Sequence, residues 1–222
     1  MDFTFGIITN SLVTNVVIDS ILKQNIINYE IVVVGGRDEY RSEIKYVPFD
    51  EGTGNYTVKK NLITQNAKYD NIVFLHDYFY LEDDWYIGFQ KFGDEWDICM
   101  NIIKNLDGSR FRDWCAYDDP ELNFPGGAQE VQTRPVITDP NHRLRLPSYD
   151  YNKFEYMYIS GGYWVAKKYV MEDEPLNENL NWGESEDVEW SKRVLPKYEY
   201  KMNQHSSIRS LKDKRLSAEY VA

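Results

Sequence analysis

Short runs of consecutive apolar residues recur through the first third of the chain, and polar or turn-forming residues bound each run. These runs predict four strands, over residues 3–9, 30–34, 43–47 and 71–76. Between them, apolar residues recur at the spacing of a helix over 12–24 and 56–67. Continuous apolar strands that alternate with helices are typical of an α/β fold. We therefore expect a mainly parallel, mixed sheet with helices on both faces.

The rest of the chain has a less regular pattern. It predicts further strands over 97–101, 156–160 and 198–203, and helices over 163–171 and 184–194. The segment 113–152 holds five of the eight prolines together with Gly126-Gly127. A loop of this length inside a compact domain is uncommon and is usually functional or mobile. We expect one domain over 1–222 with this long loop in its second half.

Composition and charge exclude several classes of protein. The 222 residues contain only Cys99 and Cys115, which excludes a disulfide framework and a cysteine-rich zinc site. The net charge of -11 argues against general binding of nucleic acid, because phosphate backbones need a basic face. No apolar run approaches the ~20 residues of a membrane span, and the N-terminus lacks a signal-peptide pattern. A cytoplasmic location is expected. The basic stretch from Lys192 to Arg215 fits either an anionic ligand or a solvated tail.

The predicted strand ends carry the candidate chemistry. Ligands of open α/β sheets gather beyond the carboxyl ends of the strands. That rule points to Thr9-Asn10, Gly35-Gly36-Arg37, Asp50 and His76-Asp77. The carboxylate of Asp77 suits a hard cation such as Mg²⁺ or Mn²⁺ that holds a diphosphate. The simpler alternative is that Asp77 caps the following turn.

Several short motifs follow one another in a recognisable order. They are FGIITN at the start, VVVGG, the helix segment Lys59-Lys60-Asn61, FLHDY, ISGGYW and the acidic segment WGESEDVEW with Arg193. In this order and spacing the chain resembles the GT-A glycosyltransferases, in particular the glycosyltransferase family 2-like group, over most of its length. The resemblance implies a single Rossmann-like GT-A domain. It also implies a nucleotide-binding half over 1–80 and an acceptor and catalytic half over 81–222.

The resemblance assigns the donor site residue by residue. It implies that the first two strand ends hold the nucleotide base and ribose, and that a basic-Asn pair precedes the metal-binding strand. It further implies that His76-Asp77-Tyr78 stands where the family has its DXD motif. The nucleotide-binding residues expected on this basis are Thr9, Asn10, Gly36, Arg37, Lys60, Asn61 and His76.

The resemblance also implies the catalytic and acceptor residues. Asp187 matches the general base, with Glu186 orienting the acceptor or sharing the role. The alternative is an ordinary acidic helix start with Glu189 and Arg193 as an ion pair. Gly161 and Gly162 resemble the turn that lets donor and acceptor approach the backbone. Independently of the resemblance, the residue types beside the proline-rich segment suggest an acceptor site, and the alternative for each of them is a structural role. The candidates for contact with the sugar or the acceptor are Trp182, Trp114 and Arg112, together with Tyr163, Arg110 and Asp113.

The DXD position departs from the family pattern. A DXD motif has two carboxylates, whereas His76-Asp77-Tyr78 has one. A Mn²⁺ or Mg²⁺ cofactor is therefore expected to be held by Asp77, with His205 resembling a later metal ligand. A histidine in that position is more often a surface residue. Asp83-Asp84 is explained more simply as an N-cap of the next helix.

The expected function is transfer of a sugar from a nucleotide-diphosphate donor, a UDP-sugar, to a hydroxyl acceptor. Inversion at the anomeric carbon follows only from the resemblance. The acceptor could be a glycan, a lipid-linked sugar or a small molecule. A sugar nucleotidyltransferase is less favoured because ITNSLVTN lacks a glycine-rich phosphate loop. A non-catalytic glycan- or nucleotide-sugar-binding protein remains the alternative from another class.

Overall fold

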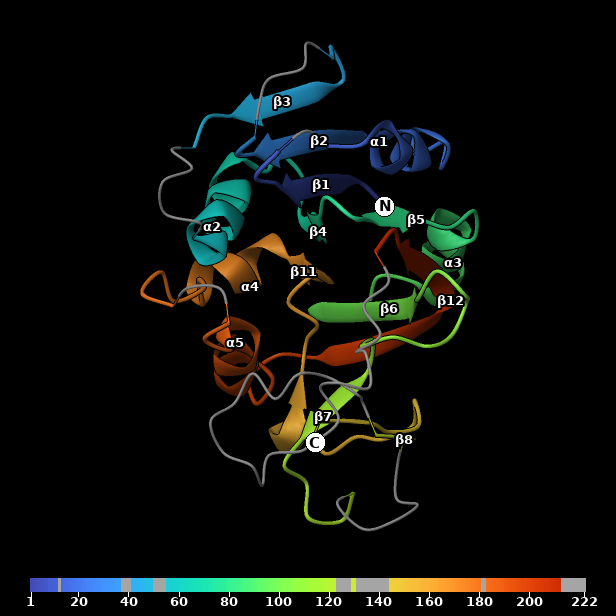
Figure 1. Ribbon diagram of the computed structural model, residues 1–222, viewed down its shortest axis with the longest axis vertical. Coiled ribbons are helices and arrows are strands. Elements are labelled where there is room, and N and C mark those ends of the chain that lie inside the picture. Colours follow the sequence, from blue (N-terminus) through green and yellow to red (C-terminus); the bar gives the residue numbers. More distant parts are fainter. Residues whose placement is uncertain are drawn as a thin grey trace.

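In the part of the chain that the structure describes, eight strands pair into one sheet in the order β3-β2-β1-β4-β11-β6-β12-β5. The computed structural model describes residues 1–11, 13–36, 41–49, 55–122, 129–130, 144–180 and 183–212. Figure 1 shows the strands stacked along the long axis of the molecule, with β3 near one end. The strands are β1 (Phe3–Ile8), β2 (Tyr29–Val34), β3 (Ile44–Val47), β4 (Asn71–His76), β5 (Phe79–Leu81), β6 (Ile98–Lys104), β11 (Tyr163–Lys167) and β12 (Tyr200–Ser210).

The sheet is mainly parallel, as the sequence predicts. Strand β1 pairs in parallel with β2 and β4, β2 with β3, and β6 with β12. Strand β11 runs antiparallel to β4 and β6, and β5 runs antiparallel to β12. Because β1, β2 and β4 are parallel, the residues that follow them meet at one edge of the sheet.

Helices cover both faces of the sheet (Figure 1). They are α1 (Asn15–Leu22), α2 (Tyr56–Asn66), α3 (Trp85–Phe92), α4 (Lys168–Asp173) and α5 (Glu186–Val194). The ring of Phe5 lies 5.3 Å from that of Trp85 in α3, whereas a Cβ added to Gly6 would lie 2.2 Å from Ile63 in α2. Successive residues of a strand face opposite sides, so α3 and α2 pack on opposite faces. The absent side chain of Gly6 allows α2 to approach β1 closely.

Helix α5 packs on the same face as α2. The Trp164 ring of β11 stacks on Phe74 of β4 at 4.5 Å and lies 5.9 Å from the Trp190 ring of α5. Phe74 is paired with Gly6, whose face is covered by α2. Because the Trp190 ring is fully buried, its burial contributes roughly 2 kcal/mol to holding α5 on the sheet. The first turn of α5 is thereby held over the sheet edge.

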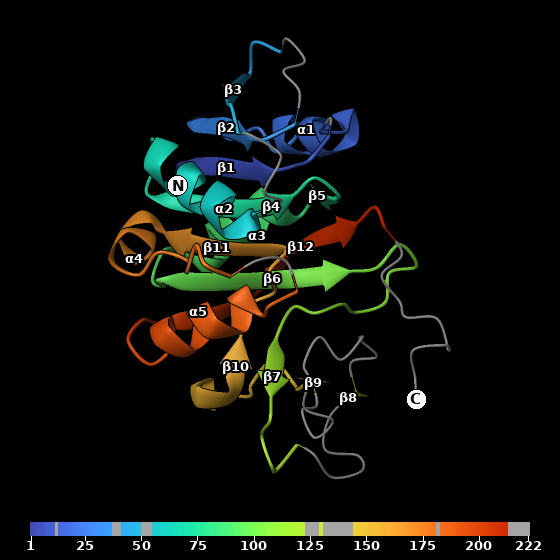
Figure 2. The same ribbon diagram turned by 60° about the vertical axis from the view of Figure 1, so that its left-hand side comes forward.

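The segment 113–152 contains strands that the sequence analysis did not predict. A second sheet has the strand order β10-β7-β9-β8, in which each strand pairs with its neighbour in this order. Its strands are β7 (Cys115–Tyr117), β8 (Gln129–Glu130), β9 (Leu144–Leu146) and β10 (Met157–Tyr158). Figure 2 shows this small sheet beyond β6, at the end of the molecule opposite β3. Each strand is only two or three residues long, too short for a period of two to be recognised in the sequence.

Three other predicted elements differ from the structure. Residues 163–167 form β11 rather than the start of a helix, and only Lys168–Asp173 is helical. The five residues of β11 lie between β4 and β6 and are mostly buried, so their run of apolar residues has no strand alternation. Of the strand predicted over 156–160, only Met157–Tyr158 (β10) is a strand, and a 3-10 turn at Phe154–Tyr156 precedes it. Strand β12 continues past Asn203 to Ser210 through an irregular register.

None of the helices in the described part of the chain combines the length and apolar character that a membrane crossing needs. The cytoplasmic location stays a prediction, as does the division of the chain into two functional halves at residue 80. The observed sheet crosses that division, because β4 pairs with β11.

Candidate functional site

Strands β1 and β4 end side by side and bring Thr9 into contact with Asp77. Ile8 is paired with His76, so the next residue of each strand lies at the sheet edge. The Thr9 hydroxyl donates to Asp77 Oδ2 at 2.6 Å and accepts from the Ser11 amide at 3.0 Å. Thr9 is buried and Asp77 is half-buried. The carboxylate of Asp77 is therefore oriented by a hydroxyl from the neighbouring strand end.

The end of β2 approaches the same place through two glycines. Gly35 and Gly36 have φ values of +85° and +72°, a region that favours glycine. A Cβ added to Gly36 would lie 2.0 Å from the carbonyl oxygen of Ser11 and 2.7 Å from Thr9 Cγ2. Gly36 thus lies against Thr9, as expected from the sequence, and only the lack of a side chain permits the contact.

We expect Gly36→Ala to lower the free energy of unfolding by about 1–3 kcal/mol more than Gly93→Ala does. Both glycines have positive φ, +72° and +88°, so alanine strains the backbone at both. Only Gly36 adds a collision, because a Cβ at Gly93 meets nothing within 4 Å. Denaturant unfolding of the two variants measures the difference. Equal losses would show that the Ser11 loop moves aside freely.

The Gly161-Gly162 turn connects the end of β4 to the start of α5. The carbonyl oxygen of Gly162 accepts from the His76 amide at 3.0 Å. The amide of Gly161 donates to Asp187 Oδ2 at 3.1 Å. A Cβ added to Gly161 would lie 2.9 Å from that oxygen, so the close approach requires glycine. The turn thus lies between the strand end that carries Asp77 and the helix start that carries Asp187.

The first turn of α5 contains three carboxylates with three different partners. Glu186 Oε1 lies 3.5 Å from Lys60 Nζ, and Asp187 binds the amides of Gly161 and Val188. Glu189 pairs with Arg193, whose Nε lies 2.6 Å from Glu189 Oε1. Ionised carboxylates in the first turn are favoured by the helix dipole. The Glu189–Arg193 ion pair of the alternative interpretation therefore exists, while Glu186 contacts Lys60 and Asp187 contacts the turn.

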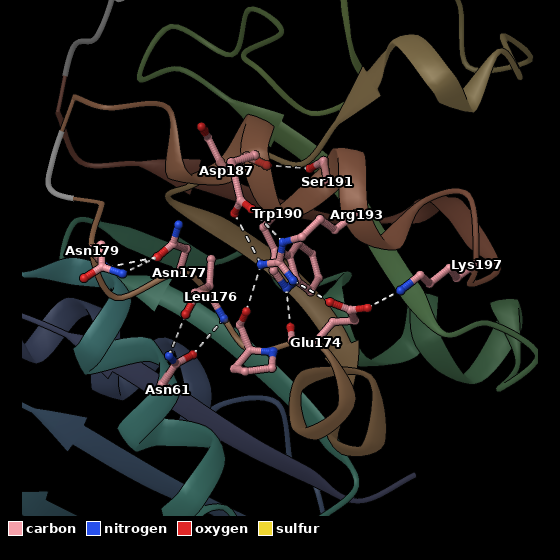
Figure 3. Close-up of polar contacts among 12 residues, drawn as sticks. Asn61, Glu174, Leu176, Asn177, Asn179, Asp187, Trp190, Ser191, Arg193 and Lys197 are labelled. Carbon is pink, nitrogen blue, oxygen red and sulfur yellow. Dashed lines mark hydrogen bonds and ion pairs between the residues drawn. The ribbon is translucent and has the colours of Figure 1, made fainter.

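Arg193 anchors the far side of α5 (Figure 3). It also pairs with Glu174 at 2.5 Å and donates to the carbonyl oxygen of Pro175 at 2.8 Å. Glu174 pairs in addition with Lys197, and its carbonyl oxygen accepts from the Trp190 indole. In the same view the Ser191 hydroxyl donates to the carbonyl oxygen of Asp187 at 2.6 Å. These contacts fix the position of the helix that presents Asp187.

The surroundings of Asp187 raise the pKa of its carboxyl to about 6. Burial contributes most, followed by the negative charge of Glu186. The charges of Lys60 and Arg112 and the Val188 amide oppose this increase. A carboxyl with a pKa near 6 is mostly ionised at neutral pH and is a stronger base than an ordinary aspartate. Asp187 has the electrostatic properties of a general base.

Two tyrosines that the sequence analysis did not assign also line the sheet edge. The rings of Tyr56 and Tyr78 each lie 5.3 Å from the His76 ring. Burial and the charge of Asp77 raise the pKa of both hydroxyls, so they stay protonated. Lys212 Nζ lies 4.6 Å from the Tyr78 ring. The sequence placed Tyr78 beside Asp77 and Lys212 in a basic stretch, but only their packing brings them together.

The structure does not place every predicted residue at the edge. The Asn61 amide donates to the carbonyl oxygen of Leu176 and to Glu178 Oε1, both at 2.9 Å (Figure 3 shows the Leu176 contact). Trp114 is 3% exposed and its ring stacks on Tyr200 at 4.6 Å. Asn61 thus secures the segment before α5, and Trp114 belongs to the core instead of a sugar-binding surface. Arg112 does act on the site, since its charge lowers the pKa of Asp187.

The structure does not bring His205 to Asp77. His205 is exposed on β12, and its carbonyl oxygen would lie 2.2 Å from a Cβ added to Gly88 of α3. The amide of Leu211 donates to the carbonyl oxygen of Tyr78, and His205 lies six residues earlier in the chain, within the irregular register between Asn203 and Ser207. It is a surface residue, the alternative that the sequence left open.

The acidic pair Asp83-Asp84 precedes α3, as expected. The Asp84 side chain makes no cap hydrogen bond to the helix. Its Oδ1 accepts instead from the amide and hydroxyl of Ser207, at 2.9 and 2.8 Å. This corrects the expected capping role of the pair: Asp84 connects α3 to β12.

Asp77 is the candidate among the described residues for holding a divalent cation at this edge. Within the described residues no group of three His, Cys, Asp or Glu side chains could hold a metal. Asp77 is the carboxylate at the strand end, and its Oδ2 is already engaged by Thr9. Mg²⁺ in nucleotide sites is commonly held by one or two carboxylates together with phosphate oxygens and water. Asp77 fits as such a single protein ligand. Arg37, Asp50 and Trp182 lie outside the described residues.

Solved structures share this fold. No protein-family model and no curated protein matches the sequence. Staphylococcus aureus TarS 1-349 matches 95% of this chain with a TM-score of 0.63 at 12% identity, and its complex with UDP-GlcNAc matches 100% with 0.59 at 14%. GalNAc-T7 with UDP, GalNAc and Mn²⁺ matches 94% with 0.65 at 13%. The chain spans 60%, 62% and 43% of these structures' own lengths. It therefore has the GT-A glycosyltransferase fold, while membership of family 2 stays a prediction.

Proposed function

We propose that this protein is a glycosyltransferase that transfers a sugar from a nucleotide-diphosphate donor, a UDP-sugar, to a hydroxyl group. The observation that carries the proposal is the Gly161-Gly162 turn. It binds His76 on one side and Asp187 on the other, and so joins the strand end of Asp77 to a carboxylate suited to be a base. A donor diphosphate near Asp77 and an acceptor near Asp187 would meet over Gly161 and Gly162, which have no side chains to obstruct them.

The donor would occupy the ends of β1, β2 and β4. Thr9, Asn10 and Gly36 gather there, and Arg37 follows Gly36 directly in the chain. His76 lies between Tyr56 and Tyr78 at the end of β4. Two structures with this fold contain UDP or UDP-GlcNAc, which supports a uridine nucleotide as the first choice.

Asp187 would act as the general base. Its carboxylate accepts the proton of the acceptor hydroxyl as that oxygen attacks the anomeric carbon. The new C–O bond forms while the bond from the anomeric carbon to the diphosphate oxygen breaks, and the diphosphate leaves with the electron pair. Attack opposite the leaving group inverts the anomeric centre. Glu186, whose charge contributes to the raised pKa of Asp187, would orient the acceptor.

Asp77 would hold Mn²⁺ or Mg²⁺ with the diphosphate oxygens. Such a cation stabilises the negative charge that develops on the departing diphosphate. GalNAc-T7, which shares the fold, contains Mn²⁺. His205 is not included in this proposal, because its position on β12 is remote from the edge.

The acceptor would bind on the side of Arg112 and the small sheet. Arg112 acts electrostatically on Asp187, and the chain from there runs directly into β7. The proposal assigns the described residues of 113–122 and 144–152 to acceptor binding, and it covers glycan, lipid-linked and small-molecule acceptors alike. Trp182, which is outside the described residues, stays a prediction.

A non-catalytic protein that binds nucleotide-sugars or glycans is the second candidate. The single carboxylate at the DXD position favours it, because the cation would have one fewer protein ligand than in a DXD enzyme. Release of UDP from a UDP-sugar separates the two candidates, since a binding protein retains the donor intact.

Thermal unfolding with added nucleotides tests the proposal. UDP, UDP-GlcNAc, UDP-GalNAc, GDP and CMP are compared with and without Mn²⁺. A ligand at 100 times its Kd adds about 2.7 kcal/mol to the free energy of unfolding, which for a protein of this size is roughly 5–10 °C in Tm. We expect UDP or a UDP-sugar to give the largest increase, and Mn²⁺ to enlarge it. No increase with any nucleotide would contradict the proposal.

A further inference from the structure

Two adjacent lysines of α2 are buried. Lys59 is 0% exposed and Lys60 is 1% exposed. Lysine is almost never fully buried unless its ammonium group is paired. Because neighbouring residues of a helix point about 100° apart, the two side chains reach different parts of the site. Their burial therefore calls for two separate sets of partners.

Lys60 contacts the catalytic side of the site. Its Nζ donates to the carbonyl oxygen of Gly161 at 2.8 Å and lies 3.5 Å from Glu186 Oε1. It also lies 4.8 Å from the centre of the Trp164 ring. Gly161 in turn donates its amide to Asp187. One ammonium group thus holds the turn and the acidic helix start together.

Lys59 contacts the nucleotide side in a corresponding way. Its Nζ donates to the carbonyl oxygen of Thr9 at 2.7 Å and to Asn10 Oδ1 at 2.5 Å. The hydroxyl of Thr9 donates to Asp77. A Cβ added to Gly35 would lie 2.6 Å from Lys59 Nζ, which shows how closely the end of β2 packs on this lysine.

We propose that Lys59 and Lys60 are paired positioning residues, of which Lys59 sets the loop that holds Asp77 and Lys60 sets the turn that holds Asp187. Each ammonium group binds the carbonyl oxygen of a residue whose other polar group binds the aspartate. Neither lysine reaches the substrate in this arrangement, although the sequence suggested Lys60 as a nucleotide ligand. The division of roles rests on the proposed function of Asp77 and Asp187.

The charge of Lys60 also acts on Asp187. The groups that face this carboxyl are Glu186 on its own helix, Lys60 on α2, Arg112 before β7 and Tyr158 on β10. Glu186 raises the pKa of Asp187, while Lys60 and Arg112 lower it. An opposite charge a few ångströms away typically lowers the pKa of a carboxyl by one unit or more. Loss of the Lys60 charge should therefore raise the pKa of Asp187.

The test compares Lys60→Met with Lys59→Met, two changes of equal size at neighbouring buried positions. UDP release from UDP-GlcNAc to water is followed against pH, and UDP binding by calorimetry. For Lys60→Met we expect the acidic limb of the pH–rate profile, where the rate falls as Asp187 becomes protonated, to shift to higher pH by roughly one pH unit. UDP affinity should change little. For Lys59→Met we expect UDP affinity to fall about tenfold while the acidic limb stays in place. Lys60→Arg, which keeps the positive charge, should have its acidic limb at the same pH as the wild type.

Two results would overturn the proposal: an unchanged acidic limb in Lys60→Met, or equal effects of both variants on affinity and on the limb. If Lys60→Met does not fold, Lys60→Gln takes its place, because glutamine removes the charge and can still donate to the carbonyl oxygen of Gly161. Its acidic limb should move to higher pH, and an unchanged limb overturns the proposal. A protein that neither binds UDP nor releases it would refute the proposed function instead. In that case a carbon-13 titration of the Asp187 carboxyl still tests Lys60, and equal titration in wild type and Lys60→Met refutes its role.

Discussion

Replacing Asp187 by asparagine is expected to reduce the rate of sugar transfer by about 100- to 10,000-fold, the usual contribution of a general base. The asparagine cannot accept the acceptor proton. Its carbonyl oxygen can still accept from the Val188 amide, as Asp187 Oδ1 does at 2.9 Å, whereas its NH₂ group loses the bond that Oδ2 accepts from the Gly161 amide. Burial and Glu186 raise the pKa of Asp187 in the folded protein, so its ionisation at neutral pH opposes folding. The variant should therefore fold, and UDP binding should persist.

UDP release from UDP-GlcNAc measures the rate, and calorimetry with UDP measures binding in the same samples. Glu189→Gln is the matched control, because it removes the same charge from the same helix turn. Glu189 pairs with Arg193, so this variant should lose a few tenths of a kcal/mol of stability and keep its activity. The wild-type rate should fall as the pH drops below about 6, where Asp187 becomes protonated. Full activity in Asp187→Asn would exclude this residue as the base.

Replacing Asp77 by asparagine is expected to have opposite effects on UDP binding with and without Mn²⁺. With Mn²⁺, loss of the carboxylate ligand should weaken UDP binding by at least 10- to 100-fold, the range seen when even supporting groups of a metal site are removed. Without Mn²⁺, UDP should bind equally well or more tightly, because a negative charge near the diphosphate has been removed. Asparagine can still accept the hydroxyl proton of Thr9, so the strand ends should keep their contact.

Calorimetric titration of UDP with Mn²⁺ and with a chelator measures both effects. Asp83→Asn serves as the control, because Asp83 is an exposed carboxylate beyond β5 on the same stretch of chain. It should change neither titration. If Asp77→Asn and wild type respond equally to Mn²⁺, the cation does not use this carboxylate, and the non-catalytic candidate gains support.

Much of the nucleotide-binding half could be predicted from the sequence alone. Apolar runs predicted β1, β2 and β4 to within one residue at each end, because strands buried on both faces have few polar positions to interrupt them. Parallel strands end at one edge, so the rule that ligands gather there located Thr9 and Asp77 before any contact was known. The acidic start of α5 could be predicted in the same way, since carboxylates are typical of a first helical turn.

Partners that are distant in the sequence were decided only by the tertiary structure. The run Tyr163–Lys167 forms a strand because β4 and β6 supply hydrogen bonds on both of its edges, and the local sequence does not encode those neighbours. Trp114 is buried by Tyr200, and His205 is held on β12 against α3, so neither reaches the position that the sequence suggested.

The motif Lys59-Lys60-Asn61 shows the same division between sequence and structure. Its composition and its place on a helix before β4 could be predicted from the sequence. The partner of each side chain could not be predicted, because neighbouring residues of a helix point about 100° apart. Lys59 contacts Thr9, Lys60 contacts Gly161, and Asn61 contacts Leu176. Local sequence determines which elements form and where the sheet edge lies. Long-range packing determines which charges meet there, because burial stabilises a lysine or a carboxylate only beside a partner from another part of the chain.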